Sequence, residues 1–399
     1  MLNNKKIVLG VCGGIAVYKA VELLRLLVKA GADVTVVMTR NAQEFVTPLT
    51  FQSLSGNPVH SELFNLYQEK TIGHISLADA ADLFIVAPAT ANVIGKVNAG
   101  IADDLLTTAI MATTAPVLFA PAMNVNMYQN PVYQRNEAAL AQLGYHFVAP
   151  AEGELACGYS GKGKLAAVED IVAAARAALS PQDLAGKTVL VSAGPTRENI
   201  DPVRYVSNYS SGKMGYAAAA AARRRGARVV LVSGPVALRA PWDVELVPVV
   251  SAAQMYDAVM QALPQADVVI KAAAVADYRP AQAAEQKIKK NSDQMSLELE
   301  RNADILAAVG QNKGERVVVG FAAESEKLLE HAADKLRRKN LDMIVANDIT
   351  ASGAGFDVDT NIVNFIYADG RVEKLAQMSK DAVADNLLER VVRLIGQQV

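Results

Sequence analysis

The sequence has few cysteines and aromatic residues, almost no net charge and no long apolar run. Its 399 residues include two cysteines, Cys12 and Cys157, and only 6% aromatic residues. Two cysteines cannot build a disulfide framework, so we expect a cytoplasmic protein. The absence of a secretory apolar segment, a transit peptide or an 18-residue apolar span argues against export and membrane insertion. A formal charge of −2 gives no general attraction to nucleic acid or anionic membranes, so any anion site must be local.

Two stretches, about 180 residues apart, begin in the same way. The first covers residues 7–28 and the second covers residues 188–207. Each starts with a short β-branched apolar run, typical of a buried parallel strand, and then breaks into a Gly-containing turn with a helix soon afterwards. Such a turn directs backbone N–H groups and a helix N-terminus towards a ligand, usually a phosphate. The repeat predicts two nucleotide-type α/β domains, in agreement with the length and the 51% hydrophobic content.

Strand and helix patterns alternate through both halves, which predicts parallel sheets covered by helices. In the first half the predicted strands are residues 7–11, 33–39, 82–88, 115–121 and 145–150, and the predicted helices are 16–29, 103–112, 131–143 and 167–179. In the second half the predicted strands are 188–194, 228–234, 267–275, 317–323 and 342–348. A hairpin is predicted at 362–375 around Asp369-Gly370, and a last helix from about Ser379. The charged stretch 289–304 is expected to be an exposed strand or flap. We place the domain boundary within 178–187, which gives domains 1–180 and 181–399.

Small, hydroxyl and amide residues follow several predicted strands of the first half. The loop GVCGGIA departs from the G-x-G-x-x-G pattern, so it fits a phosphate-binding turn and a simple tight turn equally well. The second strand ends in Thr39 rather than in the acid that holds a dinucleotide ribose, which disfavours NAD. Thr90, Asn92 and Asn124 follow two further strands. Helix capping is the ordinary role of such residues, but together they favour a planar polar ligand.

Four motifs carry a specific resemblance: HISLADAADLFIVAPATAN, GIADDLL, PAMNVNMY and ACGYSGKGKL. In this order they resemble the flavin-dependent cysteine decarboxylases, and most closely the phosphopantothenoylcysteine decarboxylase half of the bacterial bifunctional enzymes of coenzyme A biosynthesis. The resemblance implies a flavodoxin-like domain that binds FMN, with His74, Asn124 and Cys157 as catalytic residues. The expected FMN contacts are Gly13, Gly14, Ile15, Thr39, Ala89, Thr90 and Asn92.

The implied reaction explains these residue types. A cysteine carboxylate loses CO₂ only when an electron sink is present, and flavin oxidation of the thiol to a thioaldehyde supplies one. His74 suits deprotonation of the thiol near neutral pH. Asn124 can hold the substrate carboxylate, and Cys157, in a Gly-rich flap, would return the proton. Without the resemblance, a lone His is more often structural, and Cys157 is as readily buried as reactive. The chain departs from the family's pattern at Asp103, where Asn is usual, at Cys12, where Ser is common, and in the flap.

The second half contains a long Gly/Ser-rich loop, SAGPTRENIDPVRYVSNYSSGKMG (192–215), without Walker spacing. A loop of this length in a compact domain is often functional, and it carries Asn208, hydroxyls and a lysine ahead of a helix predicted near Met214. Asp277 follows a predicted strand, and Lys287 belongs to a KIKK run. Such a run is usually a solvated edge, but with Asp277 available for Mg²⁺ and further cations at Lys335 and Lys339 a polyphosphate site is the better interpretation.

Residues 194–348 resemble the phosphopantothenate–cysteine ligase half of the same bifunctional enzymes, through AGPTRE, DPVRY, SSGKMG, AAVADY, KIKK, GFAAE and KNLD. The resemblance implies that CTP activates 4′-phosphopantothenate as an acyl cytidylate, which cysteine then attacks. Asn208 would contact the acyl cytidylate, Lys287 the nucleotide, and Asp277 the Mg²⁺ ion or the nucleotide. The expected CTP contacts are Ala272, Ala273, Asp277, Asp304, Ile305, Phe321, Lys335 and Lys339.

The resemblance therefore predicts a bifunctional enzyme with FMN as cofactor, Mg²⁺ and CTP in its ligase half, and 4′-phosphopantothenate, cysteine and CTP as substrates. It implies a homo-oligomer with trimeric flavoprotein domains and dimeric ligase domains, and no nucleic-acid or membrane partner. Two alternatives are a non-catalytic flavin-fold regulatory subunit and a flavin prenyltransferase-like enzyme. The first leaves His74, Asn124 and Cys157 without a role, and the second leaves the whole second half unexplained.

Overall fold

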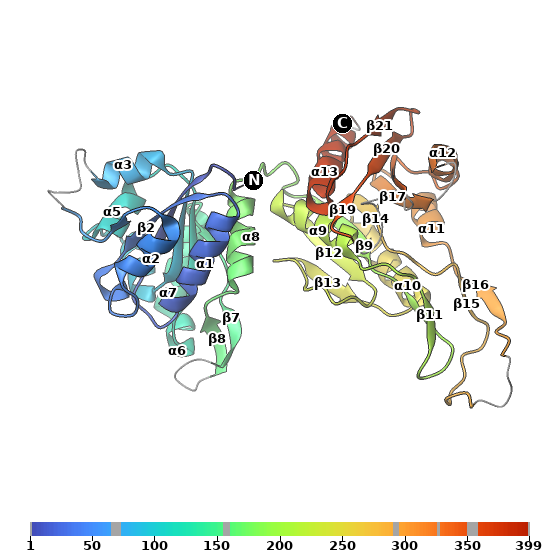
Figure 1. Ribbon diagram of the computed structural model, residues 1–399, viewed down its shortest axis with the longest axis horizontal. Helices are drawn as coiled ribbons and strands as arrows, with labels where there is room; N and C mark the ends of the chain where they lie inside the picture. The colour runs from blue at the N-terminus through green and yellow to red at the C-terminus, as the bar shows by residue number, and fades with distance from the viewer. Residues whose placement is uncertain are drawn as a thin grey trace. The chain divides into compact units, whose positions relative to one another are not determined.

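The computed structural model describes residues 2–64, 73–154, 160–289, 295–324, 328–348 and 358–397. The chain divides into two units, Met1–Pro181 and Gln182–Val399. Each unit is built on a sheet with helices on both faces, parallel in the first unit and largely parallel in the second, which confirms the predicted α/β class (Figure 1). None of the helices in the described ranges is long and apolar enough to cross a lipid bilayer.

The first unit has a six-stranded parallel sheet in the order β3-β2-β1-β4-β5-β6. Its strands are β1 (Lys6–Val11), β2 (Asp33–Met38), β3 (Val59–His60), β4 (Leu83–Ala89), β5 (Val117–Pro121) and β6 (His146–Phe147). Its helices are α1 (Val17–Lys29), α2 (Pro48–Ser55), α3 (Gly73–Ala80), α4 (Ala91–Asn98), α5 (Leu105–Ala112), α6 (Val125–Tyr128), α7 (Pro131–Gln142) and α8 (Val168–Ala178). The strand order reverses between β1 and β4, which is where ligands of such sheets bind.

Burial explains why these segments form the sheet. The seven residues of β4 are all buried, and so are the five of β5, as expected for strands covered on both faces. One face packs against α4, α5 and α7 through a cluster that includes Val86, Ile94 and Leu106. The predicted strand at 145–150 shortens to two residues in β6. After it the chain forms a separate hairpin of β7 (Ala151–Glu154) and β8 (Ser160–Lys164).

The second unit has an eight-stranded sheet in the order β13-β12-β9-β14-β17-β18-β20-β21. Its strands are β9 (Thr188–Ala193), β12 (Arg228–Ser233), β13 (Glu245–Pro248), β14 (Val268–Lys271), β17 (Val317–Glu324), β18 (Met343–Asp348), β20 (Val363–Tyr367) and β21 (Val372–Lys374). The order reverses between β9 and β14. The last two strands form the predicted hairpin, which turns at Asp369-Gly370.

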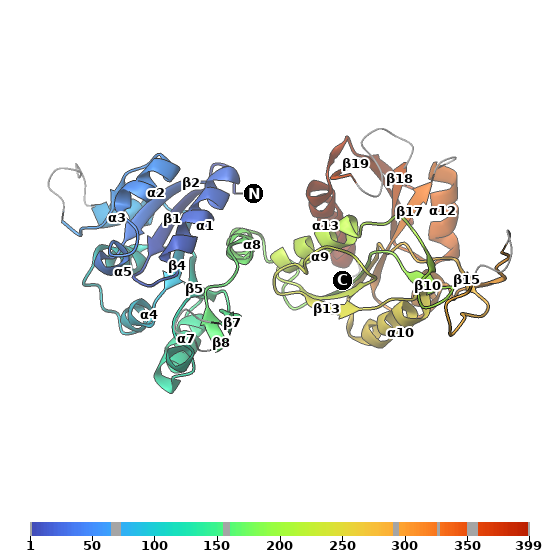
Figure 2. The same ribbon diagram turned by 60° about the horizontal axis from the view of Figure 1, so that its bottom comes forward.

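Helices cover this second sheet on both faces, as Figures 1 and 2 show. The helices are α9 (Lys213–Arg224), α10 (Ala252–Ala262), α11 (Ile305–Gln311), α12 (Leu328–Arg338) and α13 (Lys380–Gln397). Buried residues of α9 and α13 belong to one core cluster, and those of α10, α11 and α12 to another on the opposite face. The predicted N-cap of the last helix is confirmed, because the Ser379 hydroxyl accepts a hydrogen bond from the Ala382 N–H at 3.2 Å.

Two antiparallel hairpins project from one end of the second unit (Figure 1). One pairs β10 (Arg197–Asn199) with β11 (Tyr205–Ser207), and the other pairs β15 (Tyr278–Pro280) with β16 (Leu299–Arg301). The residues of β16 are exposed, which confirms the exposed strand predicted within 289–304. A third short pair joins β19 (Thr360–Asn361) and β22 (Met378–Ser379).

Candidate active sites

The residues predicted to bind FMN lie at the carboxyl ends of the neighbouring strands β2, β1 and β4. Thr39 follows β2, and its N–H donates to the Val11 carbonyl at 3.0 Å, which joins it to the end of β1. Ala89 ends β4, and Thr90 caps α4 by accepting from the Val93 N–H at 3.4 Å. Because β1 and β4 flank the reversal of strand order, these residues stand where an open α/β sheet binds its ligand.

The loop after β1 is shaped for an anion. A Cβ atom at Gly13 would lie 2.4 Å from the Cβ of Asn41, so only glycine fits against the segment after β2. A Cβ atom at Gly14 would meet nothing within 4 Å, so the loop is open on that side. The following helix, α1, has no side-chain cap, and the N-terminus of a helix favours a phosphate. These features fit the phosphate of a flavin mononucleotide.

Cys12 is a buried part of this loop rather than a reactive group. The residue is 1% exposed, and its backbone N–H donates to the Pro88 carbonyl at 3.3 Å. Burial, as the largest cause, raises the pKa of the thiol to about 12. Cys12 is therefore a neutral thiol whose backbone joins the end of β1 to β4.

The structure places two of the three predicted decarboxylase residues. His74 is half-buried near the start of α3, and Asn124 caps α6 through a 2.8 Å bond from the Asn126 N–H to its side-chain oxygen. Cys157 lies outside the described residues. The hairpin that leads to it is held beside Asn124, because the Met123 N–H donates to the Gly163 carbonyl at 2.9 Å. The convergence of all three side chains stays a prediction.

The second unit contains a cavity of about 500 Å³ at the carboxyl ends of its central strands. All eight residues predicted to contact CTP line it: Ala272, Ala273, Asp277, Asp304, Ile305, Phe321, Lys335 and Lys339. They come from the loop after β14, the start of α11, β17 and the C-terminal end of α12. Residues far apart in the sequence thus meet at one site, next to the reversal of strand order between β9 and β14.

The lining is strongly basic. Among the described lining residues the basic ones are Lys213, Lys271, Arg301, Lys335, Arg338, Lys339 and Lys380, against two acids, Asp277 and Asp304. Lys339 forms an ion pair with Asp304, and Lys335 donates to the Phe321 carbonyl at 3.0 Å. Burial and the neighbouring Arg301 lower the pKa of Lys339. An excess of positive charge in a half-enclosed space favours a polyanion.

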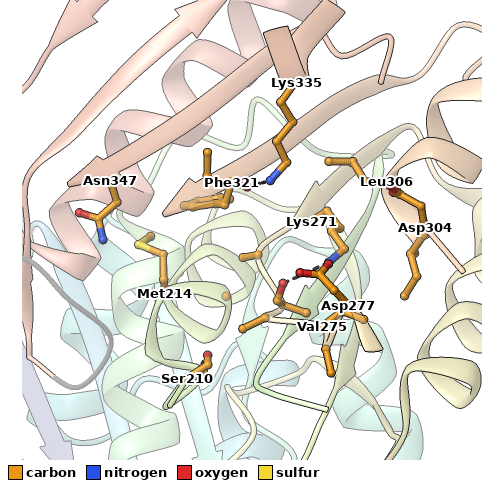
Figure 3. A pocket seen from close by; sticks show the side chains of 18 of the residues that line it. Ser210, Met214, Lys271, Val275, Asp277, Asp304, Leu306, Phe321, Lys335 and Asn347 are labelled. Carbon is orange, nitrogen blue, oxygen red and sulfur yellow. Dashed lines mark hydrogen bonds between the residues drawn. The ribbon is translucent and has the colours of Figure 1, made fainter. Parts of the chain in front are cut away.

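The opposite side of the cavity carries polar groups and the start of a helix. Ser210, Met214 and Asn347 lie there in Figure 3. The Asn347 side-chain oxygen is buried with no hydrogen-bond partner within the described ranges, so a bound ligand could donate to it. A Cβ atom at Gly215 would lie 2.5 Å from the Cβ of Ala193, so glycine allows α9 to approach β9 closely.

Lys271 is a cavity residue that the sequence interpretation missed. It ends β14, is half-buried, and donates from Nζ to the Ala273 carbonyl at 3.1 Å. Burial is the largest cause that lowers the pKa of Lys271 to about 7, and the positive charge of Lys335 also contributes. In the sequence, the one feature that could have indicated Lys271 as a site residue is its position, as a lysine at the carboxyl end of an otherwise apolar strand.

Asn208 and Lys287 stand apart from the other predicted ligase residues. Asn208 donates from Nδ2 to the carbonyl of Ala274, a cavity residue, at 2.9 Å, but it lines the adjoining groove with Arg197 and Tyr205. Lys287 is exposed and is not among the residues that line the cavity within the described chain.

The segment of Lys287 is held by an ion pair whose carboxylate, that of Asp201, is buried. Asp201 accepts the N–H of Ile288 at 3.2 Å, and the guanidinium of Arg204 donates to the Ile288 carbonyl at 3.0 Å. Asp201 also pairs with Arg204 directly, which holds the pKa of this carboxyl well below its usual range. The DPVRY motif therefore fixes the backbone beside Lys287.

The described residues contain no group of three or more His, Cys, Asp or Glu side chains arranged to hold a metal. Asp277, the predicted Mg²⁺ ligand, is exposed at the cavity. A magnesium ion here would need most of its ligands from phosphate oxygens and water, which is usual for Mg²⁺ at nucleotide sites.

Two family models together cover almost the whole chain. Residues 1–180 match the Flavoprotein family, and residues 184–395 match the C-terminal domain of the DNA/pantothenate metabolism flavoprotein family. The coenzyme A biosynthesis bifunctional protein CoaBC of Bacillus subtilis is 52% identical over 100% of this chain and 99% of its own. The protein of the same name from Vibrio parahaemolyticus is 48% identical over 99% of each chain.

Among solved structures, the chain is similar to the C-terminal domain of a CoaBC protein. The two are 45% identical, with a TM-score of 0.47, over 54% of this chain and 99% of that one. On the basis of full-length identity near one half and two successive family matches, the chain belongs to the bifunctional proteins of coenzyme A biosynthesis, with a flavoprotein half followed by a DNA/pantothenate metabolism flavoprotein domain.

Proposed function

We propose that residues 181–399 couple 4′-phosphopantothenate to cysteine at the expense of CTP, and that residues 1–180 decarboxylate the product with FMN. The observation that carries the ligase assignment is the basic cavity, which gathers all eight residues expected to contact the nucleotide. The full-length similarity to bifunctional proteins of coenzyme A biosynthesis supports both halves, and it favours a catalytic protein over a regulatory subunit.

The ligase reaction has two displacements. A carboxylate oxygen of 4′-phosphopantothenate attacks the α-phosphorus of CTP, and pyrophosphate leaves. The amine of cysteine then attacks the acyl carbon, and CMP leaves as the amide forms. Lys335 and Lys339 would neutralise the phosphates, Asp277 would bind Mg²⁺, and Phe321 would contact the nucleotide. Asn208 and Lys287 would contact the acyl cytidylate and the nucleotide from the projecting hairpins. Stabilisation of phosphate charge is the main requirement of such transfers.

In the first half, the loops after β1, β2 and β4 would hold FMN, with the phosphate at Gly13, Gly14 and the start of α1. FMN, when bound, supplies the electron transfers that make loss of CO₂ possible. His74 would accept the thiol proton, Asn124 would hold the substrate carboxylate through its amide, and Cys157 would donate a proton to the decarboxylated carbon.

The other parts of the proposal are the assembly and the compartment. We infer a homo-oligomer, with trimeric flavoprotein domains and dimeric ligase domains, from the family resemblance. In its support, the first unit exposes apolar side chains such as Ile15, Leu49 and Phe64, which a subunit contact would bury. The low cysteine content supports a cytoplasmic enzyme.

One experiment tests both activities. The purified chain, incubated with 4′-phosphopantothenate, cysteine, CTP and Mg²⁺, should release CMP and CO₂ and form 4′-phosphopantetheine. The protein should also carry the visible absorbance of FMN. Release of CMP without CO₂ would contradict the decarboxylase. A chain that releases no CMP from the full mixture, yet releases CO₂ when 4′-phosphopantothenoylcysteine is supplied separately, would contradict the ligase. A flavin prenyltransferase would give neither product.

A further inference from the structure

Lys271 lines the ligase cavity from the end of a central strand. It is the last residue of β14, the strand that adjoins β9 where the strand order reverses. The rest of β14, Val268–Ile270, is apolar and fully buried, so the strand fixes the backbone of Lys271 within the sheet. In Figure 3 its side chain lies between Lys335 and Asp277. A lysine on such a rigid strand end is held in position before a ligand arrives.

The groups around Lys271 come from each element that borders it. Lys335 and Lys339 belong to the C-terminal end of α12, and Lys339 is paired with Asp304 at the start of α11. Asp277 follows β14, and Arg301 ends β16. Of these, Lys335 and Lys339 lower the pKa of Lys271, Asp277 raises it, and burial has the largest effect, with a result of about 7.

We propose that the Lys271 side chain is a further substrate-binding group of the ligase half, which contacts the polyphosphate of the nucleotide and takes up a proton as it binds. This inference rests on the proposed nucleotide-dependent ligase. It adds a contact from the sheet that the predicted set lacks, since the cations of that set lie at the C-terminal end of α12 (Lys335 and Lys339) and on a projecting hairpin (Lys287). With Lys271 on the sheet and Lys335 and Lys339 on the helix, cations face the phosphates from two sides.

A polyphosphate is the ligand chemistry that best fits this position. Within the described residues, Lys271 Nζ donates a hydrogen bond to the Ala273 carbonyl, and an ammonium group has three donors, so further donor capacity is available to a ligand in the cavity. A lysine and two cations within one cavity repel one another when all are charged, and a polyanion removes that repulsion. The ligand should therefore bind best with Lys271 charged, whereas in the free cavity burial and the neighbouring cations lower the pKa of Lys271.

The affinity for a polyphosphate should depend on pH, because Lys271 is more fully protonated in the bound cavity than in the free cavity. Below about pH 7 the free cavity already holds the protonated lysine, so Lys271 should contribute nothing further to the pH dependence of affinity. Above that pH the lysine must gain a proton from solvent on binding, so affinity should fall by up to about tenfold per pH unit, until the pKa of the bound state is reached.

Calorimetric titration of the full-length flavoprotein tests the proposal. CTP and inorganic pyrophosphate are titrated separately at pH 8, in buffers of low and high ionisation enthalpy, to count the protons taken up. The wild-type chain should take up close to one proton more than Lys271→Met, and that variant should bind about 10- to 100-fold more weakly, the usual loss for a charge-assisted hydrogen bond. Lys271→Arg should retain affinity, take up no proton and lose the decline above pH 7.

Lys374→Met is the matched control, because Lys374 is exposed on β21 and does not line the cavity; it should behave as wild type. Equal affinity and equal proton uptake in the wild type and Lys271→Met would overturn the proposal. A wild-type chain that binds pyrophosphate but no CTP would contradict the proposed nucleotide, while the pyrophosphate titrations would still decide the role of Lys271.

Discussion

The backbone N–H of Met123 donates to the carbonyl of Gly163 at 2.9 Å, which joins the loop before Asn124 to the second strand of the β7–β8 hairpin. The same hairpin contains Cys157 between its strands. A single backbone contact therefore relates the segment that carries the proposed carboxylate-binding amide to the segment that carries the proposed proton donor. This contact leaves no space for a side chain at residue 163, because a Cβ atom at Gly163 would lie 2.4 Å from the Met123 carbonyl oxygen.

We expect Gly163→Ala to displace the hairpin from Asn124 and to lower decarboxylation about tenfold or more, as small displacements at active sites do. Gly153→Ala is the matched control. Gly153 lies in the other strand of the hairpin with φ +152°, against +155° for Gly163, but a Cβ atom there meets nothing within 4 Å. Rates of CO₂ release from 4′-phosphopantothenoylcysteine measure the effect. Equal rates in the two variants would show that the Met123 contact does not position the hairpin.

The second prediction concerns Asp201, which we infer to be a positioning residue for Lys287. Asp201→Asn weakens the pairing with Arg204 and should free the backbone at Ile288, so we expect ligase kcat/KM to fall about tenfold while decarboxylation is unchanged. If Asp201 acts through Lys287, the same substitution should cost much less in a Lys287→Gln background. Asp183→Asn, which breaks the remote Arg225–Asp183 pair, is the control. Additive losses in the double variant would refute the coupling.

Sequence periodicity predicted the parts of the fold that depend on burial. Strands such as β4 and β9 are β-branched apolar runs covered on both faces, and the sequence shows this directly. The Asp369-Gly370 turn and the Ser379 cap were predictable because a few local residues determine them. In contrast, β13 was missed because ELVP is largely exposed, and the β10–β11 hairpin was missed because its strands have three residues each.

The candidate sites were predictable to the extent that motifs mark them. The eight nucleotide residues share one cavity because strand ends and helix ends meet at the same edge of a sheet. Lys271 and Asn347 could not be found in that way. A lysine after apolar residues is ordinarily a solvated strand end, and only the three-dimensional neighbourhood shows that Lys335 and Lys339 lie near it. Likewise, the missing partner of the Asn347 oxygen is a property of packing, not of sequence.

The third prediction uses the two cysteines. In a Cys157→Ser chain the remaining thiol is Cys12, which is buried and whose pKa is raised to about 12. A pKa this high leaves a negligible fraction of thiolate at pH 8, so a disulfide reagent should label the native variant at most very slowly. Denaturation should expose the thiol and allow one equivalent of rapid labelling. Rapid labelling of the native variant would contradict the buried position at the end of β1.

The last prediction tests the proposed proton donor. If Cys157 protonates the carbon that has lost CO₂, Cys157→Ser removes the acid without removing the groups that bind the substrate or its carboxylate. The variant should then release about one CO₂ per active site in a single turnover and form no 4′-phosphopantetheine, because a serine hydroxyl is a far weaker acid than a thiol. Mass spectrometry of the quenched mixture should detect a decarboxylated species two hydrogens short of that product. Ligase activity of the same variant, followed by CMP release, is the internal control and should equal that of the wild type. Full turnover would exclude Cys157 as the donor, and the absence of any CO₂ would place its role before decarboxylation.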